Sequence, residues 1–325
     1  MEIPIYDPAD LAARIDSLRR PWHAKYLAMY SSLYQGIVTD PVLMVVPADD
    51  HLVHRADGVF DVLKCVDGRA YRLRAHLDRL ERSAAAIGLT MPADYERIHD
   101  IIRATVRAGG QPGVIVRIMV SRGPGGFTTN PYESPASQLY VLIYRLKTPA
   151  SEEYERGVTI ISAPIPVKQT FFANIKSCDY LANVLVKKAA VEAGVEFAVT
   201  WDENGYLAEG STENIILVSP DRDLLIPDFE RVLRGTTVAR VVELAEALVD
   251  SGRLASVREA RIDRKLAESC PEVMLCGTSL DVLPVRVWDG RTVGDGRPGP
   301  VAKALLELLR VDMTTNTALL TPIMD

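Results

Sequence analysis

The amino-acid sequence predicts a mixed α/β (α+β) fold with two domains. The chain has 325 residues, which is enough for two hydrophobic cores of ordinary size. Strand and helix patterns are interleaved in the first half, whereas the second half is rich in short strands with helices between them. Between these halves, residues 147–157 join Thr148-Pro149-Ala150 to a charged run, which is typical of an interdomain linker. We therefore expect one domain over residues 1–146 and a second over residues 158–325.

The first domain is expected to begin with a helix, because a helical period of apolar residues runs from residue 7 to about residue 34. Asp67-Gly68 predicts a hairpin turn between two strands. The next helix has one apolar face and ends at Gly88. Its apolar residues are Leu77, Leu80, Ala84 and Ile87. The other elements expected here are strands over residues 41–47, 59–66, 114–121 and 139–144, and a helix over residues 93–108.

The second domain is expected to alternate strands with amphipathic helices. Asn204-Gly205 and Asp289-Gly290 predict hairpin turns. The expected strands cover residues 158–162, 214–218, 273–276 and 285–288, with another around Val257, and the expected helices cover residues 177–193, 237–248 and 300–309. We expect the chain after Val311 to be loosely held, as chain ends often are.

Composition and charge exclude several classes of protein. A hydrophobic fraction of 48% and a charged fraction of 25% are those of a globular protein. The net charge is −6 and the basic residues form no run, so no nucleic-acid partner is expected. Neither a signal peptide nor an apolar run of about eighteen residues is present, which predicts no membrane span. The five histidines form no metal-binding pattern, so no metal is predicted. The cysteines lack CxxC spacing, which indicates a reducing compartment, and we expect the cytoplasm.

Lys176, in the segment NIKSCDYLANV, is the first candidate for chemistry. It precedes a predicted helix and follows the apolar residues Phe171, Phe172 and Ile175. Burial disfavours the charged ammonium, lowers the pKa of a lysine and leaves a free amine that can condense with an aldehyde. The alternative is an ordinary lysine at a helix start that keeps its charge in solvent.

Glu209 is the second candidate. The small residues Gly210-Ser211 follow it and would let a flat ring approach closely. A carboxylate beside a pyridine nitrogen keeps that nitrogen protonated by charge attraction, and the cationic ring then withdraws electrons from the substrate. The alternative is an exposed glutamate of a hairpin.

Gly235-Thr236-Thr237 opens an amphipathic helix and is a candidate anion site. The unpaired N–H groups of a first turn, the helix dipole and two hydroxyls together attract a phosphate, although a threonine can equally be an ordinary helix cap. Gly277-Thr278-Ser279 ends an apolar strand and offers a second donor. The loop RGPGGF lacks phosphate-loop spacing and is expected to be a mobile flap or a substrate loop. A nucleophilic amine, a partner for a ring nitrogen and a phosphate site are together what pyridoxal 5′-phosphate requires.

From Ala56 to Gly299 the sequence resembles the class IV aminotransferases, which include branched-chain and D-amino acid aminotransferases, (R)-selective amine transaminases and aminodeoxychorismate lyases. The matching segments are DGVFDVLKCVDGRAYRLRAHLDRLERSAAAIGL, NIKSCDYLANVLVKKAAVEAG, DENGYLAEGSTENIILV, LRGTTVARVVELA and VMLCGTSLDVLPV. The resemblance implies a fold type IV pyridoxal phosphate enzyme, with a small α/β domain followed by a larger pseudo-barrel domain. It also implies a homodimer in which each active site borrows from the neighbouring subunit. Residues 1 to about 50 do not follow the usual start of the family.

The resemblance implies roles for individual residues as well. Lys176 would be the Schiff-base lysine and would move the proton between substrate and cofactor, while Glu209 would pair with the pyridine nitrogen. Tyr180 would hydrogen-bond the phenolic oxygen of the cofactor. Arg79, in HLDRL, would bind the phosphate, although helix spacing alone places it on the surface. The other residues expected at the phosphate are Thr236, Thr237 and Thr278.

Phe60, Arg117, Arg122 and Ser279 are the predicted substrate-binding residues. Arg117 stands where branched-chain enzymes tend to carry an arginine, and Arg122 where D-amino acid and (R)-amine enzymes do. Phe60 replaces the tyrosine of D-amino acid enzymes, whereas Asp61-Val62 is closer to the (R)-amine group. The turn RGTTV lacks the arginine of the commoner GITR. The directions of Arg117 and Arg122 would decide which enantiomer is used.

The expected reaction transfers an amino group from an amino acid or amine to a 2-oxo acid, either 2-oxoglutarate or pyruvate. The alternative is a lyase of the aminodeoxychorismate type, because SRGPGG resembles that group. The segment GTSLDVLP favours the transaminases. A non-catalytic relative is disfavoured because Lys176 and Glu209 are both present.

Overall fold

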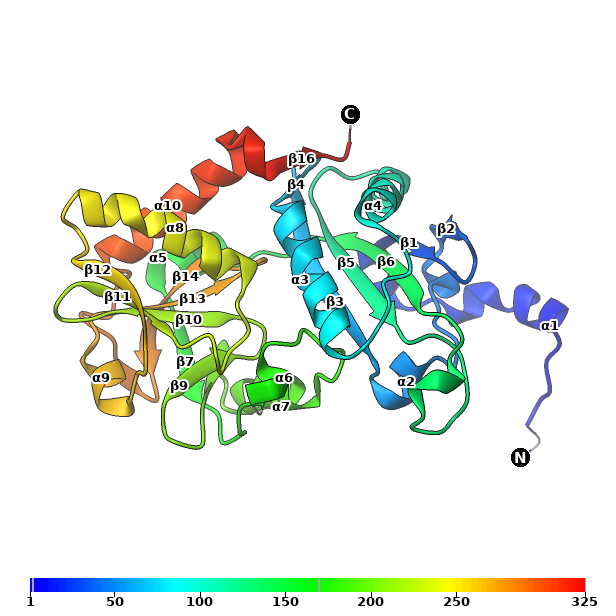
Figure 1. Cartoon of the computed structure of the whole chain (residues 1–325), viewed down its shortest axis with the longest axis horizontal. Coiled ribbons are helices and arrows are strands. Elements are labelled where there is room, and N and C mark those ends of the chain that lie inside the picture. The colour runs from blue at the N-terminus through cyan, green and yellow to red at the C-terminus, as the bar shows by residue number, and fades with distance from the viewer. Residues whose placement is uncertain (2, 169, 325) are drawn as a thin grey trace.

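A computed structural model describes residues 1, 3–168 and 170–324 of the chain. It shows two domains side by side, each built around a β-sheet (Figure 1). No helix in the described part of the chain is long and apolar enough to cross a membrane.

The N-terminal domain is built on an antiparallel sheet of seven strands among the described residues, in the order β16-β4-β3-β5-β6-β1-β2. Central strand β5 pairs with β3 on one side and with β6 on the other. The strands are β1 (Tyr26–Ser31), β2 (Gly36–Val38), β3 (Gly58–Val66), β4 (Arg69–Tyr71), β5 (Val114–Ser121), β6 (Gln138–Arg145) and β16 (Leu320–Pro322). Asp67 and Gly68 both have positive φ, at 49° and 75°, as a two-residue hairpin turn requires. The predicted hairpin is therefore confirmed.

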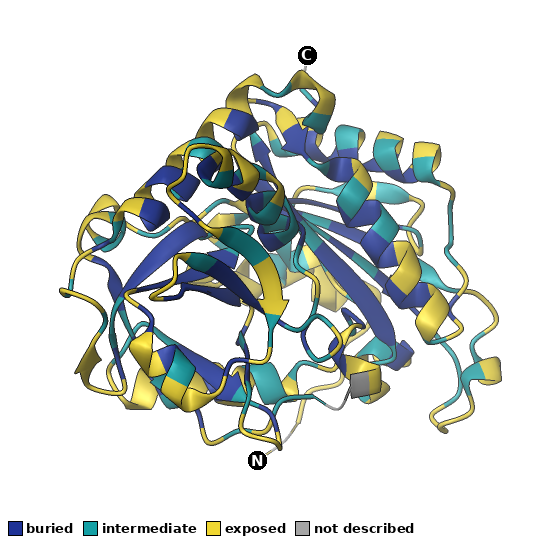
Figure 2. Cartoon of the chain, turned by 60° about the vertical axis from the view of Figure 1, so that its left-hand side comes forward, coloured by how far each residue is buried: buried dark blue, intermediate teal, exposed yellow. Residues whose placement is uncertain are grey.

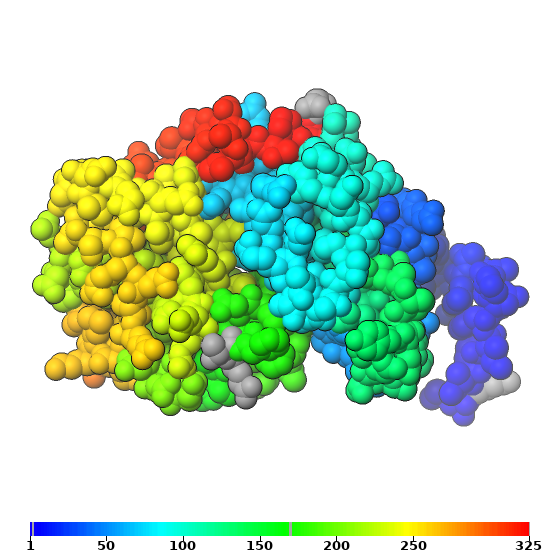
Figure 3. All heavy atoms as spheres, in the orientation of Figure 1, coloured from blue at the N-terminus to red at the C-terminus, as the bar shows by residue number. Residues whose placement is uncertain are grey.

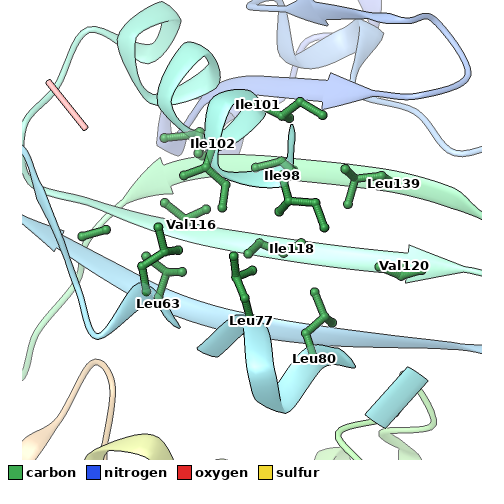
Figure 4. Packing of buried hydrophobic residues seen from close by; sticks show 14 of the residues in the cluster. Leu63, Leu77, Leu80, Ile98, Ile101, Ile102, Val116, Ile118, Val120 and Leu139 are labelled. Atoms are coloured by element: carbon green, nitrogen blue, oxygen red, sulfur yellow. The ribbon is translucent and has the colours of Figure 1, made fainter. Parts of the chain in front are cut away.

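Two helices, α3 (Leu73–Ala86) and α4 (Tyr95–Gly109), cover one face of this sheet and confirm the predicted helices. Val116 and Ile118 of β5 pack with Leu77 of α3 and Ile102 of α4 in one buried cluster (Figure 4). Because side chains alternate along a strand, Arg117 points to the opposite face. This face, which the two helices leave uncovered, lines a cavity between the domains.

The first 50 residues differ from the prediction. In place of a helix over residues 7–34 there are helix α1 (Pro8–Ala13), the 3-10 turns Ile15–Leu18 and Pro21–Lys25, and strand β1. The expected strand over residues 41–47 begins instead as the 3-10 turn Pro41–Leu43. The prediction is wrong because residues 26–31 pair with β6, and this long-range pairing overrides local periodicity.

The C-terminal domain is built on a sheet of nine strands among the described residues, and six of them close into a ring. The order is β12-β11-β10-β13-β14-β7-β8-β9, and β9 also pairs with β10, which closes the ring. This arrangement confirms the predicted pseudo-barrel. The strands are β7 (Val158–Ser162), β8 (Phe197–Trp201), β9 (Leu207–Gly210), β10 (Asn214–Val218), β11 (Asp223–Pro227), β12 (Ser256–Ala260), β13 (Glu272–Gly277), β14 (Asp281–Trp288) and β15 (Arg291–Thr292).

Helices α8 (Thr236–Asp250) and α10 (Pro300–Thr315) pack outside this barrel. Ile216 of β10 packs with Val238 and Leu305 from these helices, whereas its neighbour Ile215 belongs to a separate cluster on the other face of the strand. Figure 2 shows the resulting buried strands under helices that are exposed on their outer sides. The other helices are α2 (His51–Arg55), α5 (Ser151–Arg156), α6 (Thr170–Ala173), α7 (Leu181–Glu192) and α9 (Arg264–Ser269). Helix α5 lies within the predicted linker, residues 147–157.

The C-terminal segment contradicts the expectation of a loosely held tail. Helix α10 continues to Thr315, and strand β16 then pairs with β4 in the sheet of the N-terminal domain. Ile323 is fully buried in the core of that domain. Figures 1 and 3 show this segment, in red, running along the top of both domains. The expectation fails because the edge of β4 offers backbone hydrogen bonds that the last residues complete.

Polar contacts across the domain interface hold the two domains in place. Lys64 of β3 forms a buried ion pair with Asp281 of β14. The Tyr71 hydroxyl donates to Asp312 of α10, and Arg72 donates to the carbonyl oxygen of Thr236 at 2.8 Å. Removing one partner of the Lys64–Asp281 pair would leave the other buried without a counter-charge, which costs several kcal/mol.

Candidate active site

A cavity of about 530 Å³ lies between the two domains, within the usual size range of small-molecule sites. The N-terminal domain lines it with the sheet face that its helices leave uncovered. The C-terminal domain lines it with the ends of β9 and β13 and the start of α8. The predicted site residues in the lining are Phe60, Arg79, Arg117, Lys176, Tyr180, Glu209, Thr236, Thr237, Thr278 and Ser279. Arg122 is absent from the described lining residues.

The backbone of Lys176 is fixed to the N-terminal domain, although helix α7 after it belongs to the other domain. Phe60 N–H donates to the Lys176 carbonyl oxygen at 2.9 Å, and Cys178 N–H donates to that of Gly58 at 2.8 Å. A Cβ atom at Gly58 would lie 2.8 Å from the Val120 carbonyl oxygen, so glycine is needed where these segments meet. The lysine is therefore held at the point where the domains join.

The side chain of Lys176 is buried in the cavity. Its Nζ lies 3.5 Å from the Tyr180 hydroxyl and 4.8 Å from the centroid of the Phe60 ring. Burial lowers the pKa of Lys176 to about 8, and the nearby charge of Arg79 acts in the same direction. A substantial fraction of free amine is therefore available near neutral pH, as a nucleophilic lysine requires.

Glu209 lies at the end of β9 and is partly buried. One of its carboxylate oxygens accepts from the Leu233 N–H at 3.2 Å. Burial raises the pKa of Glu209 to about 7, against the opposing attraction of Lys176. A cationic ring nitrogen placed beside this carboxylate would hold it in the charged form.

The predicted phosphate site combines the start of α8 with the end of β13. Gly235 is the N-cap of α8, and Thr236 and Thr237 form its first turn, so their N–H groups have no partners within the helix. A Cβ atom at Gly235 would lie 2.1 Å from Asn214 Oδ1, so this turn requires glycine. The Thr278 hydroxyl donates to the Val62 carbonyl oxygen at 3.3 Å from across the cavity.

Arg79 is buried, contrary to what helix spacing alone predicts. Its guanidinium forms two hydrogen bonds, of 2.7 and 2.8 Å, to the carboxylate of Asp61. The same carboxylate lies 2.6 Å from Nδ1 of His76, whose Nε2 lies 3.2 Å from the Thr236 hydroxyl. Sequence reasoning missed Asp61 and His76 as site residues. The available signal was a carboxylate in the apolar strand VFDVLKC, because a buried charge needs a partner.

The two predicted substrate arginines occupy different environments. Arg117 lies on the face of the N-terminal sheet opposite to α3. Its guanidinium is 5.0 Å from the centroid of the Phe60 ring. No described carboxylate lies within ion-pair distance of it. Arg122 forms a two-point ion pair with Asp57 at 3.0 Å and donates to the carbonyl oxygens of Ile87 and Gly88. Arg122 therefore anchors the start of the RGPGGF loop, and Arg117 is available to a ligand.

Four lining residues near the mouth of the cavity were not predicted: Lys25, Tyr26, Arg145 and Lys147. Tyr26 begins β1 and Arg145 ends β6, which are adjacent in the sheet, while Lys25 directly precedes β1 and Lys147 follows β6. Sequence reasoning missed Lys25 and Tyr26 because the first 50 residues were assigned no place in the site, and it missed Arg145 and Lys147 because they stand in no recognised motif.

The residues in the cavity fit a phosphorylated pyridine aldehyde. The helix start at Gly235 offers donors to a phosphate, Glu209 offers a charge partner to a ring nitrogen, and Lys176 offers an amine. Among the described residues, no group of three or more His, Cys, Asp or Glu side chains could hold a metal ion.

Comparison with known proteins identifies the class. Residues 58–288 match the family model described as amino-transferase class IV, and the chain belongs to that family. Enzymes of this class use pyridoxal 5′-phosphate, so the predicted enzyme class and cofactor are confirmed at the level of the family.

Individual relatives are aminotransferases of two kinds. The chain is 36% identical over 312 residues to a D-amino-acid transaminase, chloroplastic, of Arabidopsis thaliana, which covers 96% of this chain and 82% of the relative. It is 28% identical to a putative branched-chain-amino-acid aminotransferase of Methanocaldococcus jannaschii, over 79% of this chain and 88% of the relative. Since the first match covers nearly the whole chain, it includes much of the N-terminal segment that departs from the family's usual start.

Solved structures share the fold. The branched-chain amino acid aminotransferase of Escherichia coli has a TM-score of 0.82 at 23% identity, covering 92% of this chain and 100% of that one. The branched-chain amino acid aminotransferase from Thermobaculum terrenum, solved in its PLP form, has a TM-score of 0.79 at 19% identity, covering 93% and 99%. These likenesses confirm the predicted fold type, including the pseudo-barrel.

Proposed function

We propose that this protein is a pyridoxal phosphate-dependent transaminase that uses Lys176 to move an amino group from an amino acid to a 2-oxo acid. The observation that carries the proposal is the position of Lys176 Nζ, which is buried in one cavity with Tyr180 and Glu209 and has a pKa of about 8. Membership of the class IV family supports the reaction type.

Each residue then has a physical task. When bound, the cofactor supplies an electron-withdrawing ring and an aldehyde that links covalently to an amine. Lys176 holds the aldehyde through Nζ and, once released by the incoming amine, takes and returns the proton at the substrate carbon. Glu209 stabilises positive charge on the ring nitrogen. Tyr180 places its hydroxyl beside Lys176 Nζ, where it can orient both the amine and the cofactor's phenolic oxygen.

The phosphate and the substrate carboxylate are assigned to opposite parts of the cavity. We assign the phosphate to Arg79, Thr236, Thr237 and Thr278, which surround the start of α8. We assign the substrate carboxylate to Arg117, with Phe60 and Ser279 shaping the pocket, because Arg117 is not engaged by a described carboxylate. Arg122 is not assigned to the substrate, since Asp57 already occupies its guanidinium.

Reconstitution with pyridoxal 5′-phosphate tests the proposal directly. The protein should acquire a visible absorption band that borohydride bleaches, and Lys176→Ala should lack it. If the wild-type protein, supplied with cofactor, shows no such band, the assignment of the cavity is wrong.

We further propose D-amino acids as the donors, on the strength of the similarity to a D-amino-acid transaminase over 96% of the chain. A single-turnover panel of D- and L-amino acids, without acceptor, should convert the bound cofactor to its amine form with D-substrates, and pyruvate or 2-oxoglutarate should restore it. Conversion by L-branched-chain substrates alone would reverse the stereochemical assignment. Pyruvate release from aminodeoxychorismate without conversion of the cofactor would identify a lyase instead.

We also propose that the protein is a homodimer. Large apolar side chains are exposed on two consecutive helices: Phe171 (65%) of α6, and Leu181 (66%), Val184 (58%) and Val191 (64%), whose spacing places them on one side of α7. A contiguous exposed apolar surface is typical of an interface. Sedimentation analysis should give twice the chain mass, and the double substitution Leu181→Glu with Val184→Glu should give a monomer. A wild-type monomer at micromolar concentration would contradict the proposal.

A further inference from the structure

A chain of four buried polar side chains connects the domains directly behind the proposed phosphate site. It runs from Arg79 through Asp61 and His76 to Thr236, over contacts of 2.7, 2.6 and 3.2 Å. None of the four is more than 7% exposed, so water does not compete for these contacts. Thr236 itself is fixed from the other side, because Arg72 donates to its carbonyl oxygen. We call this set the buried chain.

The positions of the protons in the buried chain follow from its chemistry. Burial alone would raise the pKa of Asp61, but Arg79 and His76 hold it well below its ordinary value, so Asp61 is ionised and only accepts. His76 Nδ1 must therefore carry a proton and donate to it. In a neutral imidazole the other nitrogen, Nε2, is then an acceptor, and it can accept from the Thr236 hydroxyl.

This neutral state is poorly suited to a phosphate. The Thr236 hydroxyl proton points to His76, so Thr236 presents lone pairs to the cavity, and a phosphate oxygen is itself only an acceptor. A second proton on the ring reverses the bond: Nε2–H donates to Thr236 Oγ1, and the hydroxyl proton is released to donate to the phosphate. The same proton changes the net charge of Arg79, Asp61 and His76 from zero to plus one, which attracts the anion.

We propose that Asp61 and His76 are positioning residues for the cofactor phosphate, and that His76 takes up one proton when the phosphate binds, turning the Thr236 hydroxyl toward it. The proposal rests on the assignment of the phosphate to the start of α8 under the proposed function. His76 acts through Thr236 and does not touch the reacting atoms.

Apart from Lys176, the other charged groups near His76 are paired with one another, so a bound phosphate would be the main new charge that acts on the ring. Burial lowers the pKa of His76, with Asp61 raising it and Arg79 and Lys176 lowering it further. The nearby space also faces Lys64 and Asp281, which form an ion pair, together with Arg72, which pairs with Glu243. These pairs balance their own charges. A phosphate dianion therefore favours the imidazolium, whereas without the anion the ring stays neutral.

Carbon-13 and nitrogen-15 NMR of histidine-labelled protein reads the ring state directly. The five histidines give few signals, and His76→Gln assigns the one of interest. We expect the imidazolium pattern at pH 7.5 in the holoenzyme and the neutral Nδ1–H pattern after removal of the cofactor. Adding pyridoxal, which lacks the phosphate, should leave the ring neutral, whereas adding inorganic phosphate at saturation should protonate it. A neutral ring in the holoenzyme would overturn the proposal.

Cofactor affinity provides a second readout. Because a proton is taken up on binding, the affinity of wild-type protein for pyridoxal 5′-phosphate should fall as the pH rises through the titration of the ring. The fall should be up to about tenfold per pH unit relative to His76→Gln. Gln can donate permanently to Thr236 but cannot titrate. His76→Asn keeps a donor for Asp61 but does not reach Thr236, and should bind the cofactor about tenfold more weakly. His99→Asn, a change on the outer helix α4, is the matched control and should behave as wild type.

The two proposals fail in different ways. If wild-type protein forms no borohydride-sensitive band, the cofactor assignment itself is wrong. If the band forms but wild type and His76→Gln show the same pH dependence of affinity, the role of His76 is wrong while the proposed function stands. Thr236→Val should bind the cofactor more weakly than wild type, because it lacks the hydroxyl that the protonated ring turns toward the phosphate; wild-type affinity in that variant would also overturn the proposal.

Discussion

The two walls of the cavity differ in charge. The wall from the N-terminal domain presents cations and, among the described lining residues, no carboxylate: Lys25, Arg79, Arg117, Arg145 and Lys147. The wall from the C-terminal domain presents two carboxylates, the partly buried Glu209 and the buried Glu213. Lys176 lies between them, bonded through its backbone to the first domain and followed by a helix of the second.

This difference separates two tasks. Burial raises the pKa of both Glu209 and Glu213, so the second wall is suited to a partner that brings positive charge, such as a protonated ring nitrogen. The first wall is suited to anions, because its cations outnumber the one carboxylate, Asp61, that pairs with Arg79. Chemistry and substrate selection can therefore be disturbed independently.

Replacing Lys176 should have the largest effect. Under the proposed function, Lys176→Ala removes both the nucleophile and the proton carrier between the two walls, and we expect turnover to fall by at least about 10³-fold for every substrate. Steady-state kinetics measures this. Lys188→Ala, at an exposed ion pair on α7, is the control and should keep wild-type turnover. A loss confined to some substrates would show that Lys176 selects substrates as well.

Glu209→Gln tests the second wall. The amide keeps the shape and can still accept from the Leu233 N–H, but it carries no charge to stabilise a protonated ring. We expect kcat to fall by about 10²-fold for all donors, with the KM for the acceptor within about threefold. Glu203→Gln, in an exposed turn, should have no effect. Unchanged kcat in Glu209→Gln would remove Glu209 from the chemistry.

Arg117→Ala and Arg122→Ala test the first wall. Losing a charge-assisted bond to a carboxylate costs about 1.5–3 kcal/mol, so Arg117→Ala should raise the KM for the oxo-acid acceptor by about 10–100-fold with little change in kcat. Arg122→Ala should leave KM within about threefold but lower the melting temperature, since Asp57 loses its partner. If Arg122→Ala raised KM as much as Arg117→Ala, the contrast between these residues would fail.

Ile323→Ala tests how the walls are held together and should affect activity least. Ile323 is fully buried beside β16, and truncating such a side chain costs about 2–4 kcal/mol of the free energy of unfolding. Thermal unfolding of the holoenzyme measures this loss, while turnover at about 25 °C should stay within about twofold. Val311→Ala, an exposed change on α10, is the control. Full stability in Ile323→Ala would mean that the C-terminal segment does not secure the domains.

Local patterns predicted much of the fold. The hairpin at Asp67-Gly68, the strand over residues 114–121 and the helix ending near Gly88 were all found, because each is encoded by turn residues or periodicity within a short segment. The strand Tyr26–Ser31 and the C-terminal strand β16 were not found. Both exist because they pair with strands distant in the sequence, and no local pattern reports such pairing.

The site divides in the same way. Lys176, Glu209, Thr236 and Thr278 could be selected from the sequence because each stands in a short segment whose chemistry is recognisable by itself. Asp61 and His76 could not, since their role arises from a chain of contacts between β3, α3 and α8. The different roles of Arg117 and Arg122 also needed the structure, which alone shows Asp57 beside Arg122.

By itself, the sequence determined the class of enzyme and selected the lysine, the glutamate and the glycine-opened helix of the proposed site, because these depend on residue type and short spacing. Only the tertiary structure decided which arginine faces the cavity, where the chain end is anchored, and how Arg79 is supported from within the core. Those features depend on which surfaces of distant segments meet. That is settled by the packing of the two domains as a whole.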